Sequence, residues 1–408
     1  MSQTDDARIY DVHDLPGLAF DPFLWESLSE APVSRIRLPH GTGECWLVTR
    51  HEDVRLVISD PRFSRDILGR SVPKMTRHFI PLDRAVSFVD PPDHARVRSV
   101  VAPHFTKRSI DRRRRRAHLV MEELCRDLEA AGPRADLISR VISPFALAMI
   151  GEVIGIPAED RPRIRDWAQT VLTRAGDDAQ ALRAEDAKQA ARSYFRQLAA
   201  QRRVRPREDV MSAMVTAVDA GRIDEEELLA LATLMGLNGW HAVCNNTANM
   251  MYVLLTQPHL MERLRGEPGD LIGPAVSELL RWIPHKHGVG QPRITTEAVA
   301  VGGVLIPEGE LVYVSYVAAN WDEAVYPDPG RIDFERQGPP HLAFGFGPHS
   351  CVGPLLARME AEVLLSTLVG RFPSMRLAIP VEDMNWQTDV LIRGPVDLPV
   401  TWSSTTVE

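Results

Sequence analysis

The sequence predicts a mainly α-helical protein with small β-sheets, an α+β fold in a single domain that covers residues 1–408. Over much of 90–285, apolar residues recur at three- and four-residue spacing, as on the buried faces of helices. Short apolar runs between turns make about 30–60 and 290–320 the β-rich portions. Although 408 residues would allow two or three domains, no repeat and no low-complexity linker divides the chain.

Composition excludes several classes of protein. The hydrophobic share of 44% and the charged share of 25% are those of ordinary globular chains, which argues against disorder. A net charge of -8 argues against a general nucleic-acid binder. The four cysteines form no CxxC pair, so a zinc ribbon, a redox dithiol and a disulfide scaffold are unsupported. The polar N-terminus and the lack of a long apolar run indicate no secretion signal and no membrane span, so we expect a cytoplasmic protein.

The first half of the chain begins with short elements and continues with helices. A turn at 41–44 precedes an expected strand at 45–50. Residues 51–60 are typical of a short helix that ends before Pro61. Farther on, apolar spacing predicts one helix over 135–155, closed by a glycine.

The longest predicted helix spans 224–258. Asp224 is a suitable N-cap, the acidic run after it matches the positive end of the helix dipole, and Pro258 closes the segment. Because most of its faces are apolar, we expect this helix to run through the interior. The chain then predicts a small sheet at 293–320, an irregular stretch at 321–350, a helix at 351–372 and short strands at 373–403.

The most informative segment is 339–358, in which Gly345, Gly347 and Gly353 surround Cys351 just before a predicted helix. Glycines allow a tight turn and a close approach of the backbone to a flat ligand. The helix directs its N-terminal N–H groups and positive dipole end at the sulfur, which stabilises a thiolate. A thiolate shielded by backbone amides suits an iron atom that needs strong electron donation.

The spacing Phe344-x-x-Gly347-x-x-x-Cys351-x-Gly353, continued by Leu-Ala-Arg at 356–358, resembles the haem-binding signature of the cytochrome P450 family. The resemblance covers nearly the whole chain. It implies the P450 fold, a triangular, helix-rich domain with haem b between the long interior helix and the cysteine loop with its following helix. It also implies electrons from NAD(P)H, delivered by a ferredoxin and a ferredoxin reductase.

The resemblance assigns roles to the loop at 344–353. Cys351 is expected to be the metal ligand, and Phe344, Gly345 and Gly353 are expected to lie against the cofactor. Four cationic side chains match the positions that bind the haem propionates in the family; they are His94, Arg98, Arg293 and His349. The planar donor fork of arginine suits a carboxylate.

A charged trio matches a structural feature of the family. Glu278 and Arg281 place opposite charges on one face of an otherwise apolar helix. Alone, such a pair could be an ordinary solvated one. The segment resembles the family's ExxR motif, and Arg336 matches its usual third partner. The resemblance implies that the trio fixes the core beneath the haem and takes no part in catalysis.

The run Arg112–Arg116 is the strongest local cluster of charge. One interpretation is a solvated helix start. The other is a dock for an acidic ferredoxin, since family members receive electrons on the cysteine side of the haem, and the cluster could steer the partner electrostatically.

The long helix departs from the family where most members carry an acid followed by alcohols that deliver protons. The acid position holds His241, the alcohol positions hold Ala242 and Val243, and Gly239 is retained. If the alignment slips by one turn, Thr247 is the nearest hydroxyl.

Asn238, His241 and Asn245 form a polar stripe on this helix. Buried polar groups destabilise a fold unless they are hydrogen-bonded. Neighbours and waters could satisfy the stripe, His241 with Asn238 could move protons, or the stripe could bind a polar substrate. Histidine is suited to proton transfer near neutral pH.

Family positions also suggest which residues touch the substrate. They are Asn238, His241, Ala242, Asn245, His287, Gly288, Val289, Leu391 and Ile392. The loop at 65–89 is expected to form a lid.

The apolar pair resembles that of natural-product P450s which form bonds instead of inserting oxygen. The C-terminal half is similar to bacterial members that act on aromatic cyclic dipeptides, and indolocarbazole-forming members also use a histidine in the long helix. We therefore expect radical coupling of a small Trp- or Tyr-derived aromatic substrate, such as a diketopiperazine. The alternatives are a conventional hydroxylase or epoxidase and, in another class, a haem protein that binds a ligand without catalysis.

Overall fold

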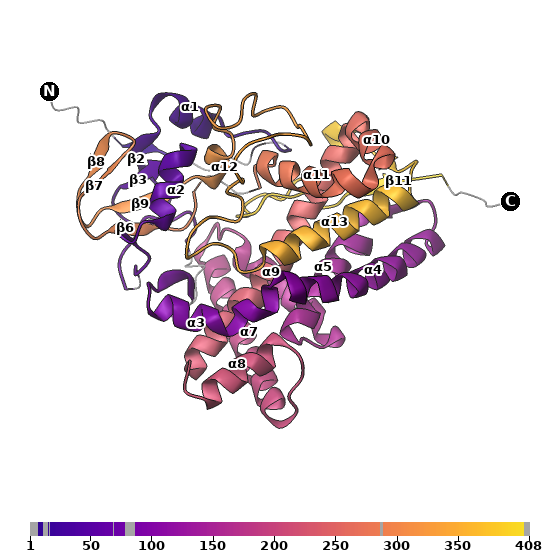
Figure 1. The fold of residues 1–408 in the computed structure, drawn as a ribbon, viewed down its shortest axis with the longest axis horizontal. Helices are drawn as coiled ribbons and strands as arrows, with labels where there is room; N and C mark the ends of the chain where they lie inside the picture. The colour runs from indigo at the N-terminus through magenta and orange to yellow at the C-terminus, as the bar shows by residue number, and fades with distance from the viewer. Residues whose placement is uncertain are drawn as a thin grey trace.

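The computed structural model describes residues 7–10, 15, 17–67, 69–77, 86–285 and 289–403. Figure 1 shows the largest sheet at one side of the molecule and the long helices filling the other. The helices are α1 (Pro22–Glu30), α2 (His51–Ser59), α3 (Asp93–Val101), α4 (Lys107–Ala130), α5 (Ser143–Ile154), α6 (Arg161–Leu172), α7 (Asp178–Val204), α8 (Val210–Asp219), α9 (Glu225–Thr256), α10 (Pro258–Gly266), α11 (Pro268–Trp282), α12 (Tyr316–Ala319) and α13 (Pro354–Arg371). This architecture agrees with the predicted fold class.

The largest sheet joins both β-rich portions of the chain in the order β1-β2-β3-β9-β6-β4. Its strands are β1 (Arg8–Ile9), β2 (Val33–Arg37), β3 (Cys45–Val48), β4 (Phe63–Ser64), β6 (Arg293–Thr295) and β9 (Leu311–Val314). β3 and β9 pair in parallel, with Trp46 opposite Val312. A second sheet has the order β10-β11-β5, from β5 (Arg134–Asp136), β10 (Arg376–Leu377) and β11 (Pro399–Thr401), and β7 (Val299–Val301) pairs with β8 (Val304–Ile306).

The segment predicted as one helix over 135–155 is divided into three parts. Its first residues belong to β5, which pairs with β11 near the C-terminal end of the chain. A π-helical turn at Ile138–Ile142 comes next, and α5 starts only at Ser143. Local apolar spacing could not predict the strand, because its partner lies more than 260 residues away in sequence.

α9 is the longest described helix, and its ends lie where the sequence indicates. Asp224 and Glu227 form a reciprocal capping box, each side chain accepting the other's backbone N–H. Pro258 lacks an N–H to continue the ladder and instead starts α10. The helix packs against α5, α6, α7 and α13, so it passes through the interior (Figure 1).

Two glycines allow α9 to approach its neighbours closely. A Cβ atom on Gly236 would lie 2.6 Å from Cζ of Phe195 in α7, and one on Gly239 would lie 2.5 Å from Cγ1 of Ile150 in α5. Both distances are far below van der Waals contact, so a larger residue would force Phe195 or Ile150, or the helices that carry them, to shift. None of the described helices is both long and apolar enough to cross a membrane.

Candidate functional site

The cysteine loop is folded so that its sulfur lies at the start of a helix. Gly345 and Gly347 adopt left-handed φ angles of 71° and 74°. The Cys351 N–H donates to the Phe344 carbonyl oxygen at 2.8 Å, and the Gly353 N–H donates to Cys351 Sγ at 3.3 Å. α13 begins directly afterwards, and Cys351 is exposed. An amide donor and a helix N-terminus at one accessible sulfur favour a thiolate.

α3 contributes two of the predicted cations to this loop. Arg98 Nη1 donates to the Ser350 carbonyl oxygen at 2.6 Å, and Arg98 Nη2 lies 3.4 Å from the Cys351 carbonyl oxygen. The rings of His94 and His349 have centroids 4.2 Å apart. Positions separated by some 250 residues in sequence are thus brought together.

Arg65 joins the same cluster, and the sequence did not indicate it. Its Nε donates to the Ser87 carbonyl oxygen at 2.8 Å, and burial together with neighbouring Arg293 lowers the pKa of Arg65 to about 9. Burial, followed by the charges of Arg65, His94, Arg293 and Arg98, lowers the pKa of His349 to about 2. A single arginine after a short strand carries no periodic signal, so only the tertiary structure shows its position.

The balance of charge in this cluster tests whether the site fits haem. Asp90 is the acid that faces Arg65, and its Oδ1 already accepts the Arg65 backbone N–H at 2.9 Å. Arg65, Arg98 and Arg293 therefore gather in a largely buried place beside two uncharged histidines, and this excess of positive charge costs free energy unless an anion binds there. The cluster and the accessible sulfur fit a flat ligand that carries carboxylates, as haem does.

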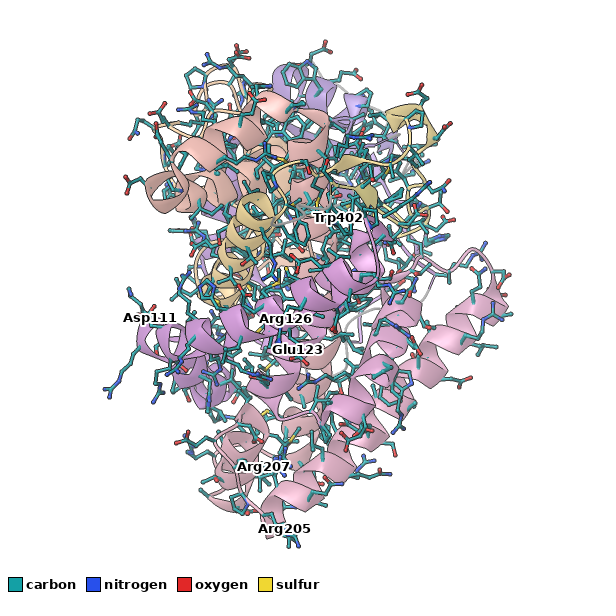
Figure 2. All side chains as sticks on the ribbon, turned by 90° about the vertical axis from the view of Figure 1, so that its right-hand side faces the viewer. Asp111, Glu123, Arg126, Arg205, Arg207 and Trp402 are labelled. Carbon is teal, nitrogen blue, oxygen red and sulfur yellow. The ribbon has the colours of Figure 1, made fainter. Side chains whose placement is uncertain are left out.

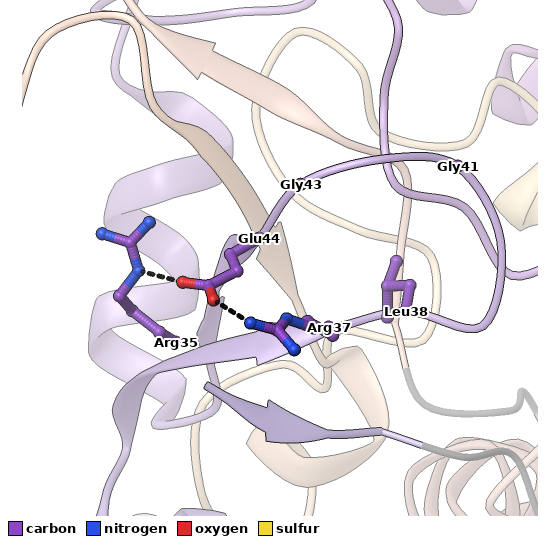
Figure 3. A pocket seen from close by; sticks show the side chains of 6 residues that line it. All are labelled: Arg35, Arg37, Leu38, Gly41, Gly43 and Glu44. Carbon is purple, nitrogen blue, oxygen red and sulfur yellow. Dashed lines mark hydrogen bonds and ion pairs between the residues drawn. The ribbon is translucent and has the colours of Figure 1, made fainter. Parts of the chain in front are cut away.

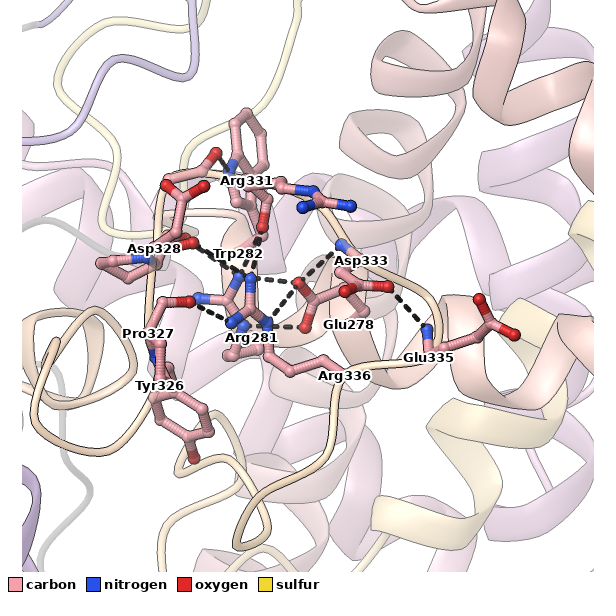
Figure 4. A network of polar contacts seen from close by, with 12 residues as sticks. Glu278, Arg281, Trp282, Tyr326, Pro327, Asp328, Arg331, Asp333, Glu335 and Arg336 are labelled. Carbon is pink, nitrogen blue, oxygen red and sulfur yellow. Dashed lines mark hydrogen bonds and ion pairs between the residues drawn. The ribbon is translucent and has the colours of Figure 1, made fainter.

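Glu278, Arg281 and Arg336 meet in one buried network (Figure 4). Both Glu278 oxygens accept from Arg281 at 2.8 Å, and Oε1 also accepts from Arg336 Nε at 3.0 Å. Arg281 further donates to the carbonyl oxygens of Asn320 and Pro329 at 3.0 Å. The trio thereby ties α11 to the irregular segment that precedes the cysteine loop.

On α9, some polar atoms of the predicted stripe have hydrogen-bond partners among the described residues and others have none. Asn238 and Ala242, one turn apart, are half-buried, and Asn238 Nδ2 donates to its own helix at Leu234 O. His241 is 2% exposed, and its Nδ1 has no hydrogen-bond partner among the described residues. Burial lowers the pKa of His241 to about 4, so the imidazole is neutral at physiological pH.

The C-terminal turn at 391–394 lies against the face of α9 that carries Asn245. Asn245 Nδ2 donates to the Ile392 carbonyl oxygen at 2.8 Å, and the Leu391 N–H donates to Leu172 O at 3.3 Å. The Thr247 hydroxyl donates to the Val243 carbonyl oxygen of its own helix. Nine residues separate Thr247 from Asn238, so the two side chains lie on opposite sides of α9.

Other predicted residues have different surroundings. Val289 is buried in a cluster with Tyr313, whereas His287, Gly288 and part of the loop at 65–89 lie outside the described residues.

The hollow in Figure 3 lies at the β2–β3 turn and contains none of the predicted site residues. There Glu44 accepts from both Arg35 and Arg37, at 3.0 and 2.9 Å.

The arginine run lies on the surface near the start of α4, just after Asp111, which is labelled in Figure 2. Arg114 pairs with Glu362 at 2.6 Å and Arg116 with Glu152 at 2.8 Å. Arg112, Arg115 and Arg116 are exposed. Part of the run therefore stabilises the fold, and three arginines, one of them paired with Glu152, are presented to solvent.

Residues 161–377 match the family model described as Cytochrome P450. Biflaviolin synthase CYP158A1 of Streptomyces coelicolor is 44% identical over 396 residues, which cover 97% of this chain and 96% of that relative. The chain belongs to the cytochrome P450 family. Membership confirms the predicted fold, the haem-thiolate cofactor and an oxidoreductase activity supplied with electrons by redox partners.

Further relatives of this P450 carry different names. The crystal structure of cytochrome P450mel 107F1 "with biaryl coupling reactivity" superposes with a TM-score of 0.91 at 43% identity, covering 95% of this chain and 97% of that one. Mycinamicin IV hydroxylase/epoxidase of Micromonospora griseorubida is 38% identical, over 97% of this chain and 98% of that relative. Bacterial secondary metabolism is common to these relatives.

Proposed function

We propose that this P450 joins aromatic rings by oxidative coupling. The observation that carries the proposal is on α9, where Ala242 and Val243 occupy the expected alcohol positions and a buried, neutral His241 precedes them. Apolar side chains such as those of Ala242 and Val243 cannot pass protons along a chain. The names of two relatives, a biflaviolin synthase and a P450 with biaryl coupling reactivity, support coupling over oxygen insertion.

In this proposal, Cys351 would hold the haem iron as a thiolate, which the Gly353 N–H would stabilise. Arg98, Arg293 and Arg65 would neutralise the haem carboxylates, His349 and His94 would hydrogen-bond to them, and Phe344, Gly345 and Gly353 would lie against the ring. When bound, haem supplies the oxidising power by activating dioxygen with electrons from the redox partner.

The reaction balances as 2 ArH + O2 + 2 e− + 2 H+ → Ar–Ar + 2 H2O. Each ring loses one hydrogen atom, and the new bond forms between the two rings. Dioxygen takes up four electrons, two from the rings and two from the partner. The protein holds the rings in contact and admits protons, for which neutral His241 offers Nδ1, an atom without a partner among the described residues.

We propose a small Trp- or Tyr-derived substrate, such as an aromatic diketopiperazine. Its ring amides could bind the half-buried polar positions on α9, Asn238 among them, while its aromatic groups lie near Ala242, Leu391 and Ile392. The second candidate is hydroxylation or epoxidation with water and His241 in place of the alcohol. The 38% identical hydroxylase/epoxidase favours that candidate.

Product analysis distinguishes the two reactions. The holoenzyme with ferredoxin, reductase and labelled dioxygen is given cyclo(Tyr-Tyr), cyclo(Trp-Trp) and a naphthol as probes. Coupling predicts a product two hydrogens lighter than its precursors and free of label. A product that gains only one labelled oxygen would overturn coupling and support the alternative. His241→Phe should retain haem and lower turnover on the order of tenfold or more.

For electron delivery, we propose that a ferredoxin docks beside Arg112 and Arg115, two exposed members of the run. Arg112→Glu with Arg115→Glu should raise the ferredoxin concentration needed for half-maximal reduction, with a smaller effect at high salt. Arg165→Glu, at an exposed pair on α6, is the matched control. Equal behaviour of both variants would place the dock elsewhere.

A further inference from the structure

One hydroxyl on α5 contacts two successive turns of α9. Trp240 Nε1 donates to Ser143 Oγ at 3.1 Å. The Cys244 thiol, four residues later, also lies beside the Ser143 side chain. Residues four apart lie above one another on a helix, so the two contacts together define which side of α9 faces α5.

The position of Ser143 depends on the π-helical turn before it. The Ser143 N–H donates to the Ile138 carbonyl oxygen, five residues earlier, and closes this turn at Ile138–Ile142. An extra residue in a turn rotates the subsequent residues by about 100° relative to a continuous α-helix. Here the turn leads the chain from β5 into α5 and leaves Ser143 at the first position of that helix.

The opposite side of α9 carries the polar groups. At about 100° per residue, Trp240 lies about 160° around the helix from Asn238. The close contact of Gly236 with Phe195 is on the side of Trp240, about 40° away, and that of Gly239 with Ile150 lies midway between Trp240 and Asn238. The rings of Trp240 and His241 contact each other, with centroids 5.8 Å apart. Rotation of α9 at Trp240 would therefore redirect His241.

We propose that Ser143 is a positioning residue that, through Trp240 and Cys244, fixes the rotation of α9 and hence the direction of His241. The inference rests on the proposed function in one respect, that His241 serves the reaction. It is independent of whether the product is coupled or oxygenated. Ser143 itself touches no reacting atom in this proposal.

The variants separate positioning from a general loss of stability. Ser143→Ala removes both contacts, Trp240→Phe keeps a ring but removes the donor, and Ser143→Thr keeps the hydroxyl. Thr247→Val is the matched control, because Thr247 is also buried on α9 but bonds only its own helix backbone. If Ser143→Ala fails to fold, Trp240→Phe still tests the proposal.

The measurement is the stretching frequency of carbon monoxide bound to the reduced haem, which responds to nearby polar groups. The difference between wild type and His241→Phe defines the contribution of His241. Ser143→Ala and Trp240→Phe should move the frequency toward that of His241→Phe, whereas Ser143→Thr and Thr247→Val should keep the wild-type value. We expect product formed per electron to fall about tenfold with the first two variants.

Wild-type frequencies in both Ser143→Ala and Trp240→Phe would overturn the inference, as would an unshifted His241→Phe. A shifted frequency without any coupled product would instead contradict the proposed coupling and leave the positioning role intact.

Discussion

Asn245 of α9 donates to the Ile392 carbonyl oxygen at 2.8 Å and so fastens the C-terminal turn to the polar face of the interior helix. The contact is close enough to require glycine two residues later, because a Cβ atom on Gly394 would lie 2.8 Å from the Asn245 Cγ. Protein atoms therefore satisfy the Asn245 amide group, whereas Nδ1 of His241, one turn earlier, has no partner among the described residues.

Asn245→Leu should destabilise the fold by about 1–3 kcal/mol, because it leaves the buried Ile392 carbonyl oxygen without its donor. It should also weaken substrate binding, since the turn forms an expected edge of the pocket. Urea unfolding and spectral substrate titration measure the two effects. Thr256→Val, which removes a hydroxyl bonded only to its own helix, should leave substrate affinity unchanged.

His241→Phe should make the protein less sensitive to acid. In the folded protein the pKa of His241 is lowered from 6.5 to about 4, so between these values the unfolded chain binds one more proton there. As pH falls through this window, the free energy of unfolding of wild type should consequently decrease by up to about 1.4 kcal/mol per pH unit more than that of the variant. Urea unfolding at pH 7, 6 and 5 checks the prediction. The same pH dependence of the unfolding free energy in both proteins would contradict it.

Glu360→Gln should stabilise the protein increasingly as pH rises. Glu360 on α13 is fully buried with Oε2 unpaired among the described residues, and burial raises its pKa well above the usual value. The unfolded carboxyl ionises near pH 4.5 while the folded one stays protonated, so wild type loses stability with rising pH until the folded pKa is reached. Unfolding at pH 5 and 8 should show the difference between variant and wild type growing, and a constant difference would refute the prediction.

Glu278→Gln should lower the free energy of unfolding by about 3–5 kcal/mol, because it leaves the buried Arg281 and the neighbouring Arg336 without their anion. Reduced haem retention and a lower unfolding midpoint are the expected readouts. Glu335→Gln removes an exposed partner of Arg263 and should change stability by less than about 1 kcal/mol. Similar losses of stability in both variants would contradict the claim that the buried Glu278 network stabilises the fold more than an exposed ion pair does.

The sequence predicted those features whose signals are local. The cap of α9, its proline end and the glycines around Cys351 are encoded within a few residues, so their positions could be read directly. The resemblance supplied His94, Arg98, Arg293 and His349, and the structure places His94 beside His349 and Arg98 against the cysteine loop. By contrast, the helix predicted over 135–155 was too long, because β5 pairs with a distant strand.

By itself, the sequence determined the class of protein and the cysteine loop, and it predicted a departure from the family's usual proton delivery at His241, Ala242 and Val243. Only the tertiary structure decided that Asn245 is used to hold the C-terminal turn, that Arg65 joins the cation cluster, and that Ser143 faces α9. These contacts join residues far apart in the chain, and packing rather than local backbone preference creates them. A polar residue on a buried helix has no fixed role until its neighbours determine which of its atoms are satisfied.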